Sequence, residues 1–327
     1  MQNPSFELTR TRLGKDGPWV GSQGLGCMGM SEFYGVTDTA EASATLARAL
    51  SLGVTLFDTA DMYGLGANES FLAPFVRANR DRVVIATKFG YTRTPEHPDD
   101  WSLCNRPEYI RAAVDRSLQR LGVDVIDLYY MHRRAPDVPL QESVGAMAEL
   151  VAAGKVRALG LCEVSATELR EAHAIHPIAA LQSEWSVFSR HIEDEVVPTA
   201  VSLGVTLVPY APLGRGLLTG QAFSTTLSPD DSRQHFPRFQ PGNRAANARL
   251  VAALDAMATA RGVSSAQLAL AWLQQKAAQM HATIVPIPGT RRRTRLEENV
   301  AATAIRLDAD TMAALEPLAE SVQGVAI

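Results

Sequence analysis

Four side chains that can hold or move a proton lie at the ends of apolar, strand-like runs of the chain. They are Asp58, Tyr63, Lys88 and His132, and the runs before them cover residues 55–57, 83–87 and 126–131. In a barrel of parallel strands, the carboxyl ends of all the strands open onto one face. We therefore expect these side chains to converge on one site, although they are far apart in the sequence.

These residue types suit proton transfer to an oxygen atom. A phenol with a pKa near ~10 is a poor acid at neutral pH, but a nearby ammonium group lowers that pKa by favouring the phenolate. We expect Lys88 to supply the ammonium group and Asp58 to keep it charged and in place. Tyr63 would then donate a proton to a developing alkoxide, and His132 would position the carbonyl oxygen. Each residue alone also has a structural explanation, but their joint placement at strand ends favours a shared site.

Reduction of a carbonyl group needs two electrons as well as a proton. Side chains do not provide a hydride, so a nicotinamide cofactor is the natural donor. Its phosphates need a basic site, and residues 284–299 combine an apolar strand, a glycine turn and four arginines where a helix begins. Helix amino termini and guanidinium groups both bind phosphate. A solvated charge run or a nucleic-acid patch is the alternative, and a net charge of −4 disfavours the latter.

Strand and helix patterns alternate along the chain. Strands are expected at 25–27, 55–57, 83–87, 126–131, 156–161, 179–182, 206–209 and 282–287, and helices at 40–52, 68–79, 107–122, 140–153, 166–175, 192–203, 245–261 and 264–274. Eight such repeats predict one α/β domain over residues 1–327, folded as a closed (β/α)8 (TIM) barrel. The remaining residues fall in a possible N-terminal hairpin at 6–20, long loops at 91–106 and 213–244 beside the active face, and a C-terminal helix at 309–319.

The stretch from Gly24 to Gly29 fits the G-x-G-x-x-G pattern of dinucleotide-binding Rossmann folds. That motif should follow an apolar strand and open a helix. Residues 18–23 do not form such a strand, and residues 30–35 have no helical period. We therefore interpret these glycines as positions that allow close approach near the first barrel strand.

Composition limits the remaining classes of protein. The three cysteines are widely spaced and odd in number, which argues against a disulfide framework and fits a reducing cytoplasm. Residues 1–13 lack the apolar core of a secretion signal, and no run approaches the ~18 apolar residues of a membrane span. A metal site is not expected, because His173 and His176 have no third ligand nearby.

Ordered motifs run along almost the whole chain. They are residues 58–64, Lys88, His132, residues 160–163, 182–186, 210–216 and 287–290, and the pair Glu298 and Asn299. In these motifs the sequence resembles the aldo-keto reductase superfamily from about Leu13 to Leu315. Within that superfamily, the sequence most resembles the bacterial and plant branch that contains perakine-reductase-like and pyridoxal-reductase-like enzymes. The resemblance implies an enzyme that reversibly reduces a small-molecule aldehyde or ketone to an alcohol with NADP(H).

The resemblance also implies roles for individual residues. It makes Asp58, Tyr63, Lys88 and His132 a catalytic tetrad in which Tyr63 is the general acid of reduction and the base of alcohol oxidation. Gln182 would hold the nicotinamide carboxamide, and Trp185 would stack on the ring. The implied cofactor contacts are Cys162, Glu163, Gln182 and Trp185 at the nicotinamide, Tyr210, Ala211, Pro212, Leu213, Gly214, Arg215, Gly216 and Leu217 along the pyrophosphate, and Ile287, Gly289, Thr290, Arg291, Arg295, Glu298 and Asn299 at the 2′-phosphate and adenine.

Other residues near the strand ends have two interpretations. Apolar side chains there either line the carbonyl pocket or fill gaps in loops, namely Met28, Met30, Phe33, Trp101 and Phe236. Arg133 and Arg134 follow His132, and we expect them to meet surface carboxylates rather than an acidic substrate. The alternative function is a regulatory or redox-sensing subunit that binds the cofactor with little turnover, although a complete tetrad favours turnover.

Overall fold

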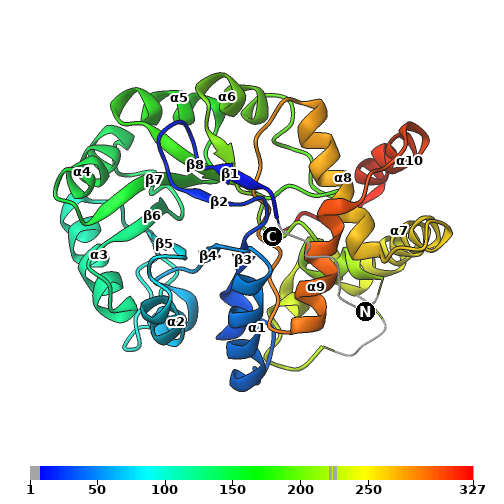
Figure 1. Ribbon diagram of the computed structural model, residues 1–327, viewed down its shortest axis with the longest axis horizontal. Coiled ribbons are helices and arrows are strands. Elements are labelled where there is room, and N and C mark those ends of the chain that lie inside the picture. The colour runs from blue at the N-terminus through cyan, green and yellow to red at the C-terminus, as the bar shows by residue number, and fades with distance from the viewer. Residues whose placement is uncertain (1–7, 221–222, 224–226, 327) are drawn as a thin grey trace.

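The computed structural model describes residues 8–220, 223 and 227–326. Its centre is a curled sheet of seven parallel strands, in which each strand pairs with the next one along the chain. They are β3 (Leu25–Gly26), β4 (Leu56–Asp58), β5 (Val84–Phe89), β6 (Ile126–Met131), β7 (Val156–Cys162), β8 (Ile178–Gln182) and β9 (Thr206–Leu207). Every residue of β4, β5 and β6 is buried, as expected for parallel strands covered on both faces. Figure 1 shows helices around these strands, and the arrangement confirms the predicted (β/α)8 barrel.

The helices begin and end at the residues that favour such boundaries. They are α1 (Thr39–Ser51), α2 (Ala67–Ala78), α3 (Pro107–Leu121), α4 (Leu140–Ala152), α5 (Ala166–Ile175), α6 (Val196–Leu203), α7 (Pro241–Ala260), α8 (Ser265–Gln279), α9 (Arg293–Ala301) and α10 (Ala309–Leu315). Ser165 and Ser264 form capping boxes at the starts of α5 and α8. Gly122 and Gly204 end α3 and α6 in the left-handed conformation. Within the described ranges, no helix combines the length and the apolar character needed to cross a membrane.

Three helix boundaries of the eight repeats differ from the predicted ones by more than one residue. α6 begins at Val196 rather than at 192, because residues 191–195 form turns in which the Glu193 carboxylate is held by other side chains. α7 begins at Pro241 rather than at 245, since proline suits the first turn of a helix. α8 extends to Gln279, beyond the predicted end at 274, through residues that favour helix.

The eighth predicted strand, residues 282–287, is not a regular strand. This segment joins the two ends of the sheet through isolated parallel bridges, Leu207 to Ile284 and Gly26 to Gly289. Pro286 and Pro288 have no N–H group, so the segment cannot form a continuous ladder. The barrel therefore closes along a seam with few backbone hydrogen bonds, such as Val285 N to Leu207 O at 2.9 Å.

The predicted N-terminal hairpin is confirmed by β1 (Arg10–Arg12) and β2 (Trp19–Gly21), while residues 6 and 7 lie outside the described ranges. It lies across one end of the barrel (Figure 1). Leu13 and Val20 pack into the apolar interior of the barrel. Thr206, at the start of β9, accepts a hydrogen bond from Gly14 N at 2.9 Å and donates one to Arg12 O at 2.9 Å. The hairpin thus covers the amino-terminal end of the strands.

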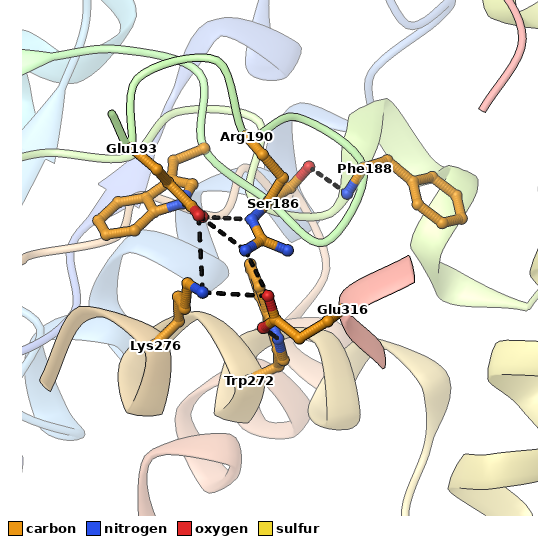
Figure 2. A network of polar contacts seen from close by, with 8 residues as sticks. Ser186, Phe188, Arg190, Glu193, Trp272, Lys276 and Glu316 are labelled. Carbon is orange, nitrogen blue, oxygen red and sulfur yellow. Dashed lines mark hydrogen bonds and ion pairs between the residues drawn. The ribbon is translucent and has the colours of Figure 1, made fainter. Parts of the chain in front are cut away.

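A network of charges fastens the loop after β8 to α8 and to the C-terminal segment (Figure 2). Glu193, in that loop, accepts hydrogen bonds from Arg190 and lies 3.6 Å from Lys276 of α8. Glu316, which follows α10, pairs with Arg190 at 2.6 Å and with Lys276 at 3.0 Å. The expected last helix is therefore split into α10 and a 3-10 helix, Glu316–Ser321, that begins at the residue held by this network.

The chain after this network packs against the long loop at the open face of the barrel. Asn247 of α7 donates a hydrogen bond to Gln323 O at 2.9 Å. Arg238, in the 3-10 helix Pro237–Phe239, donates to Gly324 O at 3.3 Å. The C-terminal segment thereby supports the loop that borders the candidate site.

Candidate active site

A cavity of about 620 Å³ lies at the carboxyl ends of the barrel strands. Its floor includes Gly26 from β3, Asp58 from β4, His132 just after β6 and Gln182 from β8. This is the face on which such barrels carry their sites. The glycine motif near β3 leads into a 3-10 helix, Met28–Met30, rather than an α-helix, which agrees with rejecting the Rossmann interpretation.

Asp58, Tyr63 and Lys88 meet beneath this cavity as predicted. Lys88 is fully buried, and its Nζ donates to Asp58 Oδ1 at 2.5 Å and to Thr59 O at 2.8 Å. The same Nζ lies 3.5 Å from the Tyr63 hydroxyl. Gln182 Nε2 donates to the other Asp58 oxygen at 2.9 Å. Asp58 therefore fixes the ammonium group directly below the phenol.

Lys88 acts on the pKa of Tyr63 in the predicted direction, but burial has the larger effect. Burial raises the pKa of Tyr63 to about 12, while the Lys88 ammonium only opposes that rise. Burial tends to lower the pKa of Lys88, but the nearby Asp58 carboxylate outweighs it, so the pKa of Lys88 is raised and the ammonium form persists. The sequence indicates the charge next to the phenol but not how far the fold removes the phenol from solvent. Tyr63 accordingly keeps its proton at neutral pH and can donate it.

His132 lies beside Tyr63, with 5.8 Å between the ring centroids. Burial, followed by the charges of Lys88 and Arg133, lowers the pKa of His132 well below its usual range. The imidazole is therefore neutral at pH 7 and carries one N–H group. Such a ring can donate a hydrogen bond to a carbonyl oxygen without adding a second positive charge.

Five aromatic side chains form a closed ring of contacts around the phenol, which we call the aromatic enclosure. Its members are Phe33, Tyr63, His132, Tyr91 and Trp101, and all of them line the cavity. The centroid distances around the ring are 6.4, 5.8, 5.2, 5.9 and 6.4 Å. Edge-on contacts of this kind stabilise rigid apolar walls. The enclosure gives the phenol a surface suited to the apolar body of a substrate.

The predicted pocket residues are mostly confirmed in their positions. Met28, Phe33, Trp101 and Phe236 line the cavity. Met30 does not, because it is buried in the main apolar core. The sequence missed Tyr91, although it follows β5 and begins the long loop at 91–106.

Trp185 does not have its predicted position beside the cavity. It is fully buried, and its indole Nε1 donates to Glu193 Oε1 at 2.8 Å in the network that holds the loop after β8. The aromatic side chain in this part of the cavity wall is Tyr210, next to the predicted Gln182. The sequence predicts Tyr210, which follows residues 206–209, as a cofactor contact along the pyrophosphate.

Cys162 and Glu163 also lie outside the cavity wall. Cys162 packs inside the barrel, and burial raises the pKa of its thiol to about 12, so it is a poor hydrogen-bond partner. Glu163 accepts a hydrogen bond from Glu184 N at 2.8 Å and lies 3.8 Å from His191 Nε2. Neither side chain lines the cavity, although the charge of Glu163 acts on the lining residue Arg133.

Residues 211–217, which are predicted to lie along the pyrophosphate and which we call the strap, line the cavity through only part of their length. The lining residues are Ala211, Pro212, Leu213, Arg215 and Gly216. Gly214 and Leu217 are buried behind them. Ala211 and Arg215 have φ values of 44° and 55°, and this left-handed backbone turns the strap tightly.

A second part of the long loop at 213–244, which the sequence predicts beside the active face, also reaches the cavity. Its residues Ser232, Arg233, His235 and Phe236 line the cavity. Ser232 N donates to Phe33 O at 2.9 Å, and Asp231 forms a bridge with Tyr34. The loops that follow β3 and β9, the two strands on either side of the closing seam, are therefore tied together beside the cavity.

The basic end of the cavity is built at the start of α9. It is lined by Ile287, Gly289, Thr290, Arg291, Arg292, Arg295 and Asn299, but not by the predicted Glu298. The Arg291 guanidinium is occupied by the loop before α1: Nη1 lies 3.0 Å from Gly35 O and 2.9 Å from Thr37 Oγ1, and Nη2 lies 2.8 Å from Tyr34 O. Arg291 thus lines the cavity and also holds the loop that carries Phe33, and Arg292, which was not among the predicted site residues, lines the cavity beside it.

Arg133 differs from its predicted surface position. It lines the cavity, while Arg134 pairs with Glu168 at 3.2 Å as expected of a surface arginine. Partial burial tends to lower the pKa of Arg133, but neighbouring groups, with Tyr210 foremost, raise it, so the guanidinium stays charged.

No group of three metal-ligating side chains occurs among the residues that the structure describes. His173 instead accepts a hydrogen bond from Ile178 N at 3.2 Å. The polar groups at the cavity include a phenol, an imidazole and a cluster of guanidinium groups, with a buried ammonium group beneath them.

Comparisons with known proteins agree with this geometry. A model described as the aldo/keto reductase family matches residues 24–320. The glycerol dehydrogenase of Gluconobacter oxydans is 26% identical, with a TM-score of 0.83 over 97% of this chain and 95% of that one. The holo form of an aldo-keto reductase from Bacillus halodurans is 26% identical, with a TM-score of 0.72 over 97% and 98% of the two chains.

A third solved structure was determined with a bound nucleotide. It is an aldo-keto reductase from Klebsiella pneumoniae in complex with NADPH, 26% identical, with a TM-score of 0.73 over 95% of each chain. The narrower resemblance to perakine and pyridoxal reductases stays a prediction, because these relatives do not test it.

Proposed function

Because the chain belongs to the aldo/keto reductase family, we propose that Asp58, Tyr63, Lys88 and His132 catalyse the reversible reduction of an aldehyde or ketone with NADP(H). The observation that carries this assignment is the buried Lys88 ammonium, which contacts both Asp58 and Tyr63 below the cavity. We also propose that residues 1–327 form one domain, since the described parts of the hairpin, the long loops and the C-terminal segment all pack onto the same barrel.

The side chains divide the reaction as follows. When bound, NADPH supplies the hydride, so the carbonyl carbon gains two electrons and one hydrogen. Tyr63 gives its phenolic proton to the carbonyl oxygen, which completes the alcohol, and a solvent proton later restores the phenol. Lys88 stabilises the phenolate that forms, and the neutral His132 donates a hydrogen bond to the oxygen as negative charge develops on it.

The residues along the cavity fit a phosphorylated dinucleotide. Gln182 and Tyr210 lie beside the tetrad and are suited to the nicotinamide, as a hydrogen-bonding amide and an aromatic face. The Arg215 Nε atom in the strap is buried and has no hydrogen-bond partner among the described residues, as expected of a donor that awaits an anion. At the far end, Thr290, Arg292, Arg295 and Asn299 surround the start of α9, where a 2′-phosphate and an adenine would be held.

Arg292 and Arg295 should set the preference for the phosphorylated cofactor. Replacing both by alanine is expected to raise the Kd of NADPH roughly 10- to 100-fold, because only NADPH has the 2′-phosphate that charged hydrogen bonds would hold. The Kd of NADH should change much less, and fluorescence titration measures both. Arg293→Ala is the control, since Arg293 pairs with Glu41 outside the cavity wall. Equal losses for the two nucleotides would remove the phosphate assignment.

Arg291→Met should instead act at the substrate end of the cavity. It removes the hydrogen bonds to Tyr34, Gly35 and Thr37 and so loosens the loop that carries Phe33. We expect KM for carbonyl substrates to rise roughly three- to tenfold, because small displacements of a positioning wall are costly. The ratio of NADPH to NADH affinity should be unchanged. A lowered ratio would show that Arg291 binds the 2′-phosphate after all.

The alternative, a sensor subunit with little turnover, has a direct test. NADPH absorbance is followed with a panel of aldehydes and ketones. Consumption of NADPH that depends on the carbonyl supports the reductase, whereas NADPH binding without consumption across the panel supports the sensor. A small-molecule carbonyl substrate follows from the family. We place the reaction in the cytoplasm and away from nucleic acid, because the cysteines are free and the net charge is −4.

A further inference from the structure

The backbone around Arg133 is fixed on both sides. His132 N donates to Phe89 O at 2.8 Å, which extends the pairing of β5 and β6 by one residue. Two residues beyond Arg133, Ala135 N donates to the buried Asn105 Oδ1 at 2.5 Å. The Arg133 side chain therefore leaves a rigid segment next to the aromatic enclosure.

The Arg133 guanidinium makes only one hydrogen bond to the described protein. Its Nη1 donates to His132 O at 2.7 Å, and no carboxylate among the described residues pairs with it. Two other cavity arginines near the loops are occupied, since Arg233 pairs with Asp231 at 2.6 Å and Arg291 binds the loop before α1, and Arg215 lies in the strap, where we assign it to the cofactor. Arg133 therefore keeps donors without a protein acceptor while it lines the cavity.

No acidic side chain of the described cavity lining pairs with the Arg133 guanidinium. Asp58 is the acidic residue of the lining, and both of its oxygens are already bound, one by Lys88 and the other by Gln182. Glu163 lies outside the lining; its charge helps to raise the pKa of Arg133, but its carboxylate makes no ion pair with that guanidinium and instead accepts a hydrogen bond from Glu184 N at 2.8 Å and lies 3.8 Å from His191 Nε2. A half-buried guanidinium that no carboxylate contacts directly can bind a further anion, because a desolvated charge is stabilised chiefly by a partner of opposite sign.

We propose that Arg133 binds a carboxylate group of the carbonyl substrate while the aromatic enclosure holds an apolar body between that carboxylate and the reacting carbonyl. This inference rests on the proposed reductase function and names its substrate class, an aromatic or apolar aldehyde or ketone that also bears an acid. A guanidinium group suits this role because it presents parallel N–H donors to a carboxylate. Its position immediately after His132 places the recognition group beside the group that would orient the carbonyl.

The test compares two aldehydes that differ only in the acid. The wild-type protein is expected to reduce 4-carboxybenzaldehyde with a higher kcat/KM than its neutral ester, methyl 4-formylbenzoate. Arg133→Met should lower kcat/KM for the acid roughly 10- to 100-fold, as expected for lost hydrogen bonds to a charged group, and lower it far less for the ester. Arg133→Lys, which keeps the charge but loses the planar fork, should fall between the two. Arg134→Met is the matched control and should leave both substrates unaffected, because Arg134 pairs with Glu168 outside the cavity.

A binding measurement makes the result independent of turnover. Calorimetry follows 4-(hydroxymethyl)benzoate, the alcohol product, binding to the NADPH-loaded protein, a pair that cannot react. Arg133→Met should weaken this binding roughly 10- to 100-fold, and Arg134→Met should not. The circular dichroism spectrum and Tm of each variant confirm that it is folded.

Three outcomes would overturn the inference. Equal losses for the acid and the ester would show that Arg133 only shapes the cavity. Weaker NADPH binding in Arg133→Met, with no selective loss for the acid, would assign the guanidinium to a cofactor phosphate. Unchanged binding of the benzoate would exclude a carboxylate site. If wild-type protein reduces neither aldehyde yet binds the benzoate through Arg133, the reductase function fails while the carboxylate site stands.

Discussion

Tyr63→Phe is expected to lower kcat for carbonyl reduction by about 10²- to 10⁴-fold, the usual contribution of a general acid. The variant keeps the ring and its contacts with Phe33 and His132, so the aromatic enclosure is preserved. It loses only the hydroxyl that lies 3.5 Å from Lys88 Nζ. Steady-state kinetics with one aldehyde, together with the Kd of NADPH, measure the two effects. We expect that Kd to stay near the wild-type value.

The matched control for this variant is Tyr91→Phe. Tyr91 belongs to the same aromatic enclosure, and its ring centroid lies 5.2 Å from that of His132. The hydroxyl that lies near Lys88 Nζ is that of Tyr63. The Tyr91 hydroxyl should therefore matter far less to kcat. Retention of wild-type kcat in Tyr63→Phe would exclude Tyr63 as the proton donor. A similar loss in both variants would indicate a disturbed cavity rather than a missing acid.

Lys88→Met is expected to damage stability and turnover together. It leaves the buried Asp58 carboxylate without its ammonium partner, and removal of one member of a buried pair typically costs about 3–5 kcal/mol. It also removes the charge that favours the Tyr63 phenolate, so kcat should fall steeply. Urea unfolding gives the free energy of unfolding, and steady-state kinetics give kcat.

The double variant Asp58→Asn with Lys88→Met separates these two effects. With both charges gone, part of the lost free energy of unfolding should return, while kcat should stay low. Recovery of kcat in the double variant would show that Lys88 acts on Tyr63 only through the stability of the fold. An unchanged free energy of unfolding in Lys88→Met would mean that Asp58 takes up a proton and needs no partner.

The tetrad could be predicted because it depends on local sequence patterns. Apolar runs locate the strands, parallel strands share one open face, and the polar residue at each strand end must therefore face it. Lys88 shows the limit of this argument. Its position was correct, but its effect on the Tyr63 pKa was outweighed by burial, and burial depends on every loop that covers the site.

The aromatic partner at the nicotinamide end was misassigned for a different reason. Trp185 and Tyr210 both follow predicted strands, so periodicity does not distinguish them. They differ in their hydrogen-bond partners: Glu193 accepts a hydrogen bond from Trp185 Nε1 and so stabilises the indole in its buried position. Glu193 is in turn held near Lys276 of α8, a contact between distant parts of the chain that no local pattern reveals.

The arginines show the same limit for charge. Sequence marks where guanidinium groups gather, but it does not show their acceptors. Arg291 is bound by carbonyl oxygens near the start of the chain, so the residue first expected to hold a phosphate holds a loop. Arg133 shows the converse, because a residue expected at the surface lines the cavity.

The seam that closes the barrel has a consequence for how the chain is assembled. β3 is synthesised before residues 282–289, so one of its edges has no partner in the barrel until those residues follow. Until then both β3 and β9 present open edges, and unpaired strand edges are templates for pairing with other chains. The same residues that close the barrel lead directly into the basic end of the cavity. A nascent chain therefore completes its protection against aggregation and its cofactor site in one late step.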